Sequence, residues 1–498
     1  MYSDRLDSLA ADSGGQLISG RPDTLIHGLY SDTRTPSPGG LFVALRGEHF
    51  DGNSFARDAI ERLGASAVLI DSAEIAACLP TNVGVILVHD TREGYLNIAA
   101  RFRERISSSL WVGVTGSVGK SSTKEMISHI FENGTGWKIH KAKGSFNNAV
   151  GLSHTILNAT DKDQAVVLEL GTNHPGEIRQ LTAVARPNIA VITCAAASHL
   201  EAFETVANVA AEKSCILSFQ SPHDIAVLNA DDPHFQSWCS IARGKILSFG
   251  THSDAHVQGY DICFKSDGCA DFKVRWINCI ENKLPGSADV PPAGPTNGTA
   301  CHRDAGAPGE YNAYENCSLR IPGMHSVRNA LAALAVAIAA GIELRTSVIS
   351  LGSFEGIARR FSVKQVRGIT LIDDAYNANP ASFVAALETM KTLKARRRFV
   401  IAGDMLELGP KADEYHRELG RLLPDYGIHA LMTVGPLAKI AGMSAVEQGL
   451  AHANWTQCST PEEAAAFLKP MLRDGDAVLI KGSHGIHLER AYELLCRL

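Results

Sequence analysis

The sequence predicts an α/β protein of three domains, with a P-loop ATPase-like domain in the middle. The chain has 498 residues, which is long for one hydrophobic core and suggests about three domains. Short apolar segments alternate with helix-like stretches, as in mostly parallel sheets that helices cover. One apolar segment ends in a glycine-rich turn followed by a Lys-Ser pair, which is typical of a phosphate-binding loop. We expect domains at residues 1–104, 105–349 and 350–498.

The first domain is predicted to be a small α/β module. Its strand candidates are three short apolar segments, Leu41 to Leu45, Ala67 to Ile70 and Val83 to Val88. The stretch Phe55 to Leu63 lies between the first two and is predicted to be a helix.

The middle domain is predicted to contain a mostly parallel sheet. After a first strand that begins at Trp111, compact strand candidates alternate with polar helical segments: Ala165 to Leu168, Ile189 to Thr193 and Ile225 to Leu228. Prolines and glycines interrupt this pattern over residues 284–309. We expect a flexible surface insertion there, because such a composition buries too little apolar area to become ordered.

The last domain is predicted to be Rossmann-like. Its alternation of strands and helices starts near Phe361, and its strand candidates are Ile369 to Ile372, Phe399 to Ile401, Ala430 to Val434 and Ala477 to Ile480. No G-x-G-x-x-G follows any of these segments, so a dinucleotide cofactor is not indicated.

Composition restricts the partners and the compartment. The formal net charge of −6 gives no broad basic surface, so no nucleic-acid partner is expected. The N-terminus resembles no secretion signal, and the longest apolar run, Ala330 to Ala340 with its flanks, is too short to span a bilayer. The 11 cysteines include no C-x-x-C pair, which disfavours a zinc site and a disulfide framework. We expect a cytoplasmic, monomeric protein that does not insert into membranes.

The phosphate loop is the most informative motif. Thr115 to Ser122 reads Thr-Gly-Ser-Val-Gly-Lys-Ser-Ser between an apolar strand and an amphipathic helix. In such a loop backbone amides converge on phosphate oxygens, Lys120 reaches the terminal phosphates, and the hydroxyl of Ser121 is a ligand for Mg²⁺. Val114 stands where the general pattern has glycine, five residues before Gly119. The alternative, a glycine turn with a solvated lysine, is disfavoured because all the parts occur in the right order.

Three polar residues of the middle domain have a functional and an ordinary interpretation. Glu169 ends the strand that starts at Ala165, where an acid suits Mg²⁺, although carboxylates at strand ends are more often solvated. His199 follows the next strand and is either a metal ligand or, as is commoner for a lone histidine, a packed or a surface residue. Lys213 lies in the helical stretch Val206 to Leu217, where chemistry alone predicts a solvated lysine.

The turn Asp373 to Pro380 ends a strand of the last domain with two acids, an aromatic residue, two amides and a proline. Functional groups collect at such strand ends, but the same residue types also form ordinary turns. Only the whole combination makes this segment a candidate site.

These motifs resemble those of the Mur ligases, ATP-dependent enzymes that form amide bonds in peptidoglycan precursor synthesis. The similarity covers nearly the whole chain, with matches at Ser31 to Arg34, Phe42 to Gly47, the phosphate loop, Phe146 to Asn148, Glu169 to Asn173, Pro322 to Ala330, Asp373 to Pro380, Gly403 to Gly409 and Lys481 to Ser483. The motifs of the last domain look like the branch that joins D-alanyl-D-alanine to a UDP-N-acetylmuramoyl-tripeptide through an acyl phosphate. The resemblance implies a uridine-nucleotide-binding domain, an ATPase-like domain and a Rossmann-like domain that closes on the nucleotide.

The resemblance also implies a role for each matching residue. The implied catalytic residues are Lys120, His199, Lys213 and Arg360. Two Mg²⁺ ions are implied, held by Ser121, Glu169, His199 and Lys213, the last carbamylated by CO₂. The implied contacts to ATP are Thr115, Gly116, Ser117, Val118, Gly119, Lys120, Ser121, Ser122, Asn148, His325, Asn329, Arg360, Asp374, Tyr376 and Asn377. The UDP-linked substrate is implied to lie beside Ser31, Asp32, Thr33 and Arg34.

The chain departs from the usual family motifs at Cys215 (for Glu), His484 (for Arg), Arg359 (for Gly) and Ser153 (for Pro). The alternatives are another ligase of the superfamily, such as a folylpolyglutamate synthetase, a nucleotide-dependent switch, and an inactive homologue. The Asp373 to Pro380 turn argues against the first, and the lack of a guanine-binding N-K-x-D signature argues against the second. The candidate catalytic residues are all present, which argues against the third.

Overall fold

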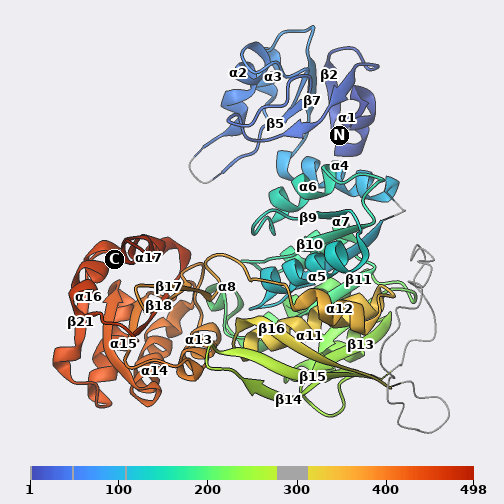
Figure 1. The fold of residues 1–498 in the computed structure, drawn as a ribbon. Helices are drawn as coiled ribbons and strands as arrows, with labels where there is room; N and C mark the ends of the chain where they lie inside the picture. Colours follow the sequence, from blue (N-terminus) through green and yellow to red (C-terminus); the bar gives the residue numbers. More distant parts are fainter. Residues whose placement is uncertain (1–2, 48–49, 107–108, 278–311, 498) are drawn as a thin grey trace.

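The computed structural model describes residues 3–47, 50–106, 109–277 and 312–497, and their strands form four sheets (Figure 1). The N-terminal lobe (blue) lies above the middle lobe, and the C-terminal lobe (orange to red) lies beside the middle lobe. The predicted insertion at residues 284–309 lies outside the described residues. None of the helices in the described part of the chain combines the length and apolar character that crossing a bilayer requires.

The N-terminal lobe contains a five-stranded sheet of order β2-β7-β6-β5-β4, parallel except for β2, and a two-stranded sheet of β1 and β3. The strands are β1 (Ser3–Arg5), β2 (Gln16–Ser19), β3 (Leu25–His27), β4 (Leu29–Tyr30), β5 (Leu41–Val43), β6 (Ala67–Ile70) and β7 (Gly84–Leu87). The helices are α1 (Leu6–Ser13), α2 (Ala56–Glu61), α3 (Ala73–Ala77) and α4 (Thr91–Arg105). The three predicted strands and the predicted helix are confirmed as β5, β6, β7 and α2.

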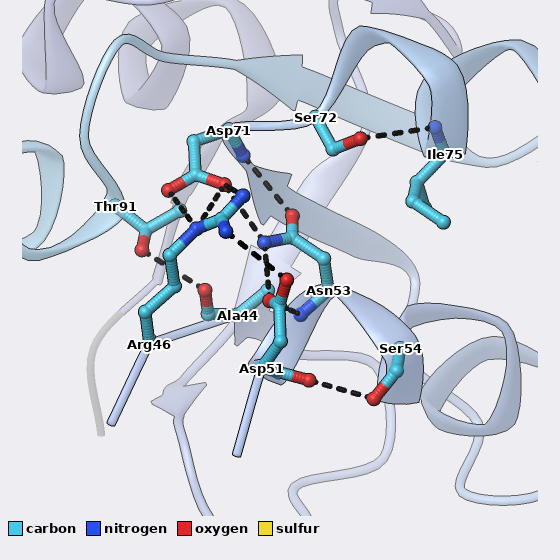
Figure 2. A network of polar contacts seen from close by, with 9 residues as sticks. All are labelled: Ala44, Arg46, Asp51, Asn53, Ser54, Asp71, Ser72, Ile75 and Thr91. Carbon is cyan, nitrogen blue, oxygen red and sulfur yellow. Dashed lines mark hydrogen bonds and ion pairs between the residues drawn. The ribbon is translucent and has the colours of Figure 1, made fainter. Parts of the chain in front are cut away.

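A polar network links residues that follow β5 with a residue that follows β6 (Figure 2). Arg46 donates from Nε and Nη2 to Asp71 at 3.0 and 2.8 Å, and its Nη1 lies 3.2 Å from Oδ2 of Asp51. The side-chain amide of Asn53 donates to both of these carboxylates at 2.7 Å. The network therefore ties the end of β5 to the end of β6.

Helix α4 connects the N-terminal and middle lobes. Its buried residues Tyr95 and Ile98 belong to the same apolar cluster as Leu6 of α1 and Leu152 of α6 (Ala149–Leu157). The two lobes therefore share a continuous core.

The middle lobe contains a nine-stranded sheet of order β16-β15-β14-β13-β12-β11-β8-β10-β9. The strands are β8 (Leu110–Thr115), β9 (Ile139–Lys141), β10 (Ala165–Glu169), β11 (Ile189–Ile192), β12 (Ile225–Asn229), β13 (Lys245–Gly250), β14 (Val257–Phe264), β15 (Cys269–Ile277) and β16 (Asn312–Pro322). The predicted parallel sheet is confirmed from β9 to β14, whereas β15 and β16 extend it as antiparallel strands.

Helices cover both faces of this sheet. They are α5 (Lys120–Thr135), α6, α7 (Glu177–Ala185), α8 (Leu200–Phe203), α9 (Val206–Ser214), α10 (Phe235–Ile241), α11 (Met324–Ala339) and α12 (Leu344–Leu351). In β8, Trp111 faces one apolar cluster, whereas Val112 and Val114 face another. Strands buried on both faces are typical of parallel sheets, and β8 lies between β10 and β11, so the carboxyl ends of all three meet at one edge.

The C-terminal lobe contains a six-stranded sheet of order β17-β18-β22-β19-β20-β21, parallel except for β17. The strands are β17 (Ser362–Val366), β18 (Ile369–Asp374), β19 (Arg398–Gly403), β20 (Ile428–Val434), β21 (Trp455–Cys458) and β22 (Ala477–Lys481). The helices are α13 (Pro380–Thr392), α14 (Ala412–Leu422), α15 (Pro436–Glu447), α16 (Pro461–Leu468) and α17 (Glu489–Leu495). All four predicted strands are confirmed, as β18, β19, β20 and β22.

Candidate active site

A cavity of about 360 Å³ lies between the middle and C-terminal lobes, and we call it the interdomain cavity. Residues that follow β8, β10 and β11 line it from one lobe, and residues that follow β18, β19 and β22 line it from the other. The lining brings together most of the residues singled out in the sequence: Ser117, Val118, Gly119, Lys120, Ser122, Glu169, His199, His325, Asn329, Arg360, Asp374, Tyr376 and Asn377.

The conformation of the phosphate loop depends on glycine at two positions. Gly119 has a φ of +88°, and a Cβ there would lie 2.3 Å from Oδ1 of Asn329. A Cβ on Gly116 would lie only 1.9 Å from Oγ1 of Thr193, so a larger residue at either position would force the loop to move. Nζ of Lys120 donates to the carbonyl of Gly116 at 2.7 Å, and burial lowers the pKa of Lys120.

Glu169 lies at the centre of a network below this loop. Its Oε2 accepts a hydrogen bond from Oγ of Ser121 at 2.6 Å, and its Oε1 accepts one from the amide of Asn147 at 3.0 Å. Asn148, which was expected to contact the nucleotide, caps α6 by accepting from N of Gly151 at 2.9 Å and lies outside the lining of the interdomain cavity. Its neighbour Asn147 lines the interdomain cavity.

A buried lysine, Lys124, supports the same region. Its Nζ donates to the carbonyls of Ala142 and Gly144 at 2.8 and 2.7 Å and lies 3.9 Å from Oε2 of Glu169. In the sequence Lys124 is one more lysine in an amphipathic helix, so only the tertiary structure shows that it is enclosed.

Lys213 is also buried, with 1% of its surface exposed, so the expectation of a solvated lysine is wrong. Burial lowers its pKa to about 7, and the charge of Lys120 acts in the same direction. The preceding residue, Glu212, accepts hydrogen bonds from N of Ile178 at 2.7 Å and N of Gly176 at 2.8 Å, which holds α9 against α7. Lys213 lies outside the lining of the interdomain cavity.

His199 and Glu407 meet across the two lobes. Nδ1 of His199 lies 2.6 Å from Oε2 of Glu407, and both side chains line the interdomain cavity. The adjacent ring of His199 lowers the pKa of Glu407, although Nδ1 of His199 makes no hydrogen bond of good geometry. Both residues have left-handed backbone, with φ of +52° and +63°. Glu407 was not predicted as a site residue, although the Gly403 to Gly409 motif contains it.

On the C-terminal side, a buried ion pair supports the turn after β18. Nζ of Lys481 donates to Oδ2 of Asp374 at 2.6 Å and to the carbonyl of Asn377 at 3.0 Å. The guanidinium of Arg360 lies 4.1 Å from the centre of the Tyr376 ring, a cation–π contact. This stacking fixes the plane of the Arg360 guanidinium, which faces the phosphate loop.

Two further contacts close the cavity from the C-terminal lobe. The hydroxyl of Tyr376 is hydrogen-bonded to that of Ser145 in the middle lobe. The ring of His325 packs edge-on against Phe361 at 5.5 Å, and burial lowers the pKa of His325 to about 4, so it is neutral at pH 7.

The remaining predicted residues lie outside the interdomain cavity. Thr115 donates from Oγ1 to the carbonyl of Leu170 at 2.8 Å, which joins β8 to the end of β10. Ser31 to Arg34 follow β4 in the N-terminal lobe, where Arg34 pairs with Asp32 at 2.7 Å and lowers the pKa of this acid to about 2.

Two of the departures from the family motifs also lie apart from the cavity. Cys215, which directly follows α9, contacts the carbonyl of Ala211 in α9 at 3.7 Å, and Ser153 is fully buried in α6. His484 lines the cavity and packs edge-on against Tyr376 at 6.0 Å. Arg359 has a φ of +63°, a conformation in which glycine is free of strain.

The geometry suits phosphoryl transfer. Two cations, Lys120 and Arg360, and the N-terminus of α5 face one space, so negative charge developing there meets preorganised groups. The oxygens of Ser121 and Glu169 lie beside it and are the ligand type that Mg²⁺ prefers. The cavity is lined by both lobes, so a nucleotide and an acceptor would meet there between them.

Comparison with known proteins agrees with this geometry. Residues 25–103 match the Mur ligase family, catalytic domain, residues 114–291 the Mur ligase middle domain, and residues 359–484 the Mur ligase, glutamate ligase domain. The chain is 31% identical to the UDP-N-acetylmuramoyl-tripeptide–D-alanyl-D-alanine ligase of Bacillus subtilis over 471 residues, 94% of this chain and 92% of the relative.

Solved structures show the same likeness. The fold superposes on a crystal structure of MurF from Acinetobacter baumannii with a TM-score of 0.84 and 25% identity, over 100% of both chains. It also superposes on the MurF ligase from Thermotoga maritima in complex with ADP, with a TM-score of 0.76 and 24% identity over 94% of this chain and 97% of the other. The chain therefore belongs to the Mur ligase family and, within it, to the MurF branch.

Proposed function

We propose that this chain is the ATP-dependent ligase that joins D-alanyl-D-alanine to UDP-N-acetylmuramoyl-tripeptide, the activity in the name of its relatives. The observation that carries the proposal is the interdomain cavity, where a phosphate loop on one lobe faces Arg360 and the Asp374 to Asn377 turn on the other. This arrangement would place a nucleotide on the phosphate loop within reach of groups from both lobes.

In the proposed reaction ATP transfers its γ-phosphoryl group to the terminal carboxylate of the tripeptide, and ADP leaves. The amine of D-alanyl-D-alanine, once it has lost a proton, then attacks the acyl carbon. The carbon–oxygen bond to phosphate breaks as the amide forms. A carboxylate is a poor electrophile, and the phosphate supplies it with a leaving group. The first step brings together two anions, the γ-phosphate and the carboxylate. The positive charges of Lys120 and Arg360 offset the repulsion between these anions, so these two residues should contribute most to catalysis.

We propose that Ser121 and Glu169 hold one Mg²⁺ ion and that His199 binds another. The hydroxyl and carboxylate oxygens of the first two lie 2.6 Å apart, a donor set that fits a hard divalent cation. When bound, Mg²⁺ neutralises charge between ATP and the carboxylate. His325, Asn329, Asp374, Tyr376 and Asn377 are proposed to hold the nucleotide, and Ser31, Asp32, Thr33 and Arg34 the UDP-linked substrate.

We propose that Lys213 is carbamylated. The neutral amine is the form that attacks CO₂, and a pKa of about 7 keeps much of it neutral at physiological pH. The nitrogen bonds to the carbon of CO₂ and releases a proton, which leaves an anion able to support a second Mg²⁺. Lys213→Ala should regain part of its activity in acetate, and Lys213→Arg should stay inactive. Full activity of Lys213→Arg, or no carbamate signal in ¹³C NMR under ¹³CO₂, contradicts the proposal.

The decisive experiment measures ADP release by the purified protein with UDP-N-acetylmuramoyl-tripeptide, with and without D-alanyl-D-alanine. Turnover should depend on both substrates, because the acyl phosphate must be trapped by an amine. Equal ATP hydrolysis without either substrate, or a preference for GTP, rejects the ligase.

We further propose a monomer whose domains divide near residues 104 and 349. A cytoplasmic location is proposed because each described cysteine is free of a disulfide. A sedimentation coefficient that rises with protein concentration would contradict the monomer.

A further inference from the structure

His416 is a fully buried histidine on α14 that contacts the turn after β19 (405–408). N of Met405 in this turn donates to Nε2 of His416 at 2.9 Å, and Nδ1 of His416 lies 2.7 Å from the carbonyl oxygen of Ala412. A backbone N–H only donates a hydrogen bond, and a carbonyl oxygen only accepts one. Both contacts are therefore satisfied together by a neutral ring that carries its proton on Nδ1.

The surroundings of His416 favour this neutral ring. Burial lowers the pKa of His416 and outweighs the hydrogen bond to Ala412 and the charges of Asp404 and Asp413, which favour the charged ring. A doubly protonated ring would direct an N–H group at the N–H of Met405, and the hydrogen bond between them would be lost. The ring is thus held in one protonation state and one tautomer.

The turn after β19 carries part of the candidate active site. Leu406 and Glu407 line the interdomain cavity. N of Leu406 donates to Oγ of Ser483 at 2.9 Å, and N of Glu201 in α8 of the middle lobe donates to the carbonyl of Glu407 at 3.3 Å. The amide that donates to His416 immediately precedes these residues, so this hydrogen bond fixes the turn at the point where it enters the cavity lining.

We propose that His416 is a positioning residue for the ligase reaction, which holds the turn after β19 in the conformation that lines the interdomain cavity and contacts the middle lobe. His416 lies outside the lining of the cavity, so it acts only through this turn. The feature that matters is the acceptor lone pair of Nε2, since the turn offers it a backbone N–H. The proposal rests on the proposed ligase function and adds to it a buried residue on which the contact between the two lobes depends.

The kinetic test compares two amides that replace different halves of the imidazole. The side-chain oxygen of His416→Gln reaches the position of Nε2 and accepts from Met405, whereas the amide of His416→Asn reaches only the position of Nδ1. A displacement of about 1 Å in an active site can cost about 100-fold in rate, so we expect kcat of His416→Asn to fall by about 10- to 100-fold, with a smaller change in the KM for ATP. His416→Gln should retain most of the activity.

Two further variants complete the comparison. His416→Leu fills the space without an acceptor and should show the same loss as His416→Asn, so the test remains valid if one of the two does not fold. His223→Asn, the same change at an exposed histidine of the middle lobe, should match the wild type. Equal kcat values for His416→Gln and the variants without an acceptor, or a loss confined to KM, overturn the proposal.

A spectroscopic measurement needs no turnover. In protein labelled with ¹⁵N in methionine and histidine, a hydrogen bond from N–H of Met405 to Nε2 of His416 gives a scalar coupling between the two nitrogens, assigned by its loss in His416→Gln. We expect this coupling in the wild type, with the ring proton on Nδ1. Its absence overturns the proposal, even if the protein joins the substrates. Conversely, the coupling in a protein without ligase activity would leave the contact between His416 and the turn standing and reject the proposed function.

Discussion

Replacing Lys481 by Met should destabilise the C-terminal lobe by several kcal/mol. The Lys481 side chain is 1% exposed, and its ammonium pairs at 2.6 Å with Asp374, whose side chain is 16% exposed. Met keeps the length of the chain but leaves the carboxylate with a single neutral donor, N of Phe361 at 3.0 Å. Removing one partner of a buried ion pair costs roughly 3–5 kcal/mol, because the other charge stays buried and unpaired.

Hydrogen exchange of peptides from β18 and β22 measures this loss locally. A change of 3–5 kcal/mol corresponds to roughly 100- to 5,000-fold faster exchange of amides that open with the whole lobe. The double variant Lys481→Met/Asp374→Asn removes the unpaired charge and should exchange more slowly than Lys481→Met alone. Lys364→Met, on the exposed side of β17, is the control and should leave exchange unchanged. A loss of less than about 1 kcal/mol in Lys481→Met refutes this explanation. It is also refuted if the double variant loses as much free energy of unfolding as Lys481→Met and Asp374→Asn lose together.

Three further variants test other parts of the site. Lys120→Ala should lower kcat for ADP release by roughly 100-fold or more while the melting temperature stays near that of the wild type, because one preorganised charge at the phosphates is lost. Lys213→Met should be inactive yet more stable at pH 7. Between pH 7 and 10.5, Lys213 is protonated in the unfolded chain but mostly neutral in the folded protein, so in CO₂-free buffer the free energy of unfolding of the wild type should increase with pH. Urea unfolding of Lys213→Met should not show this increase. Arg359→Gly relieves a positive φ and should change stability by less than about 1 kcal/mol, whereas Arg417→Gly, within α14, should cost about 1 kcal/mol in the same urea measurement.

The features that sequence predicted are local in the chain. Ala67–Ile70 is continuously apolar and bounded by polar residues, and it forms β6 with the predicted bounds. The phosphate loop carries strand, turn and helix signals within a dozen residues, and so its structure depends little on the rest of the molecule. The antiparallel strands β15 and β16 were missed, because their half-buried residues lack the continuous apolar run of a central strand.

The features that sequence could not predict depend on contacts between distant segments. Glu407 gains its position only when the turn after β19 packs on α8, and nothing near it in the chain identifies His199 as its partner. Lys124 and Lys213 look like solvated helix lysines, and only the assembled layers around α5 and α9 enclose them. Asn147 and Asn148 have the same side chain. Because α6 begins at Ala149, Asn148 is its N-cap and Asn147 faces the cavity, and the sequence does not show where the helix begins.

The pairing of β15 with β16 need not depend on how many residues connect the two strands. Ile277 and Asn312 are paired neighbours in the sheet, so the chain leaves and returns at one point on its edge. Directly paired residues of two antiparallel strands lie close enough for a two-residue turn to join them. An Asn-Gly turn in place of residues 278–311 should therefore keep the same pairing, and the edge of the sheet is a place where segments can be exchanged while the interdomain cavity keeps its lining.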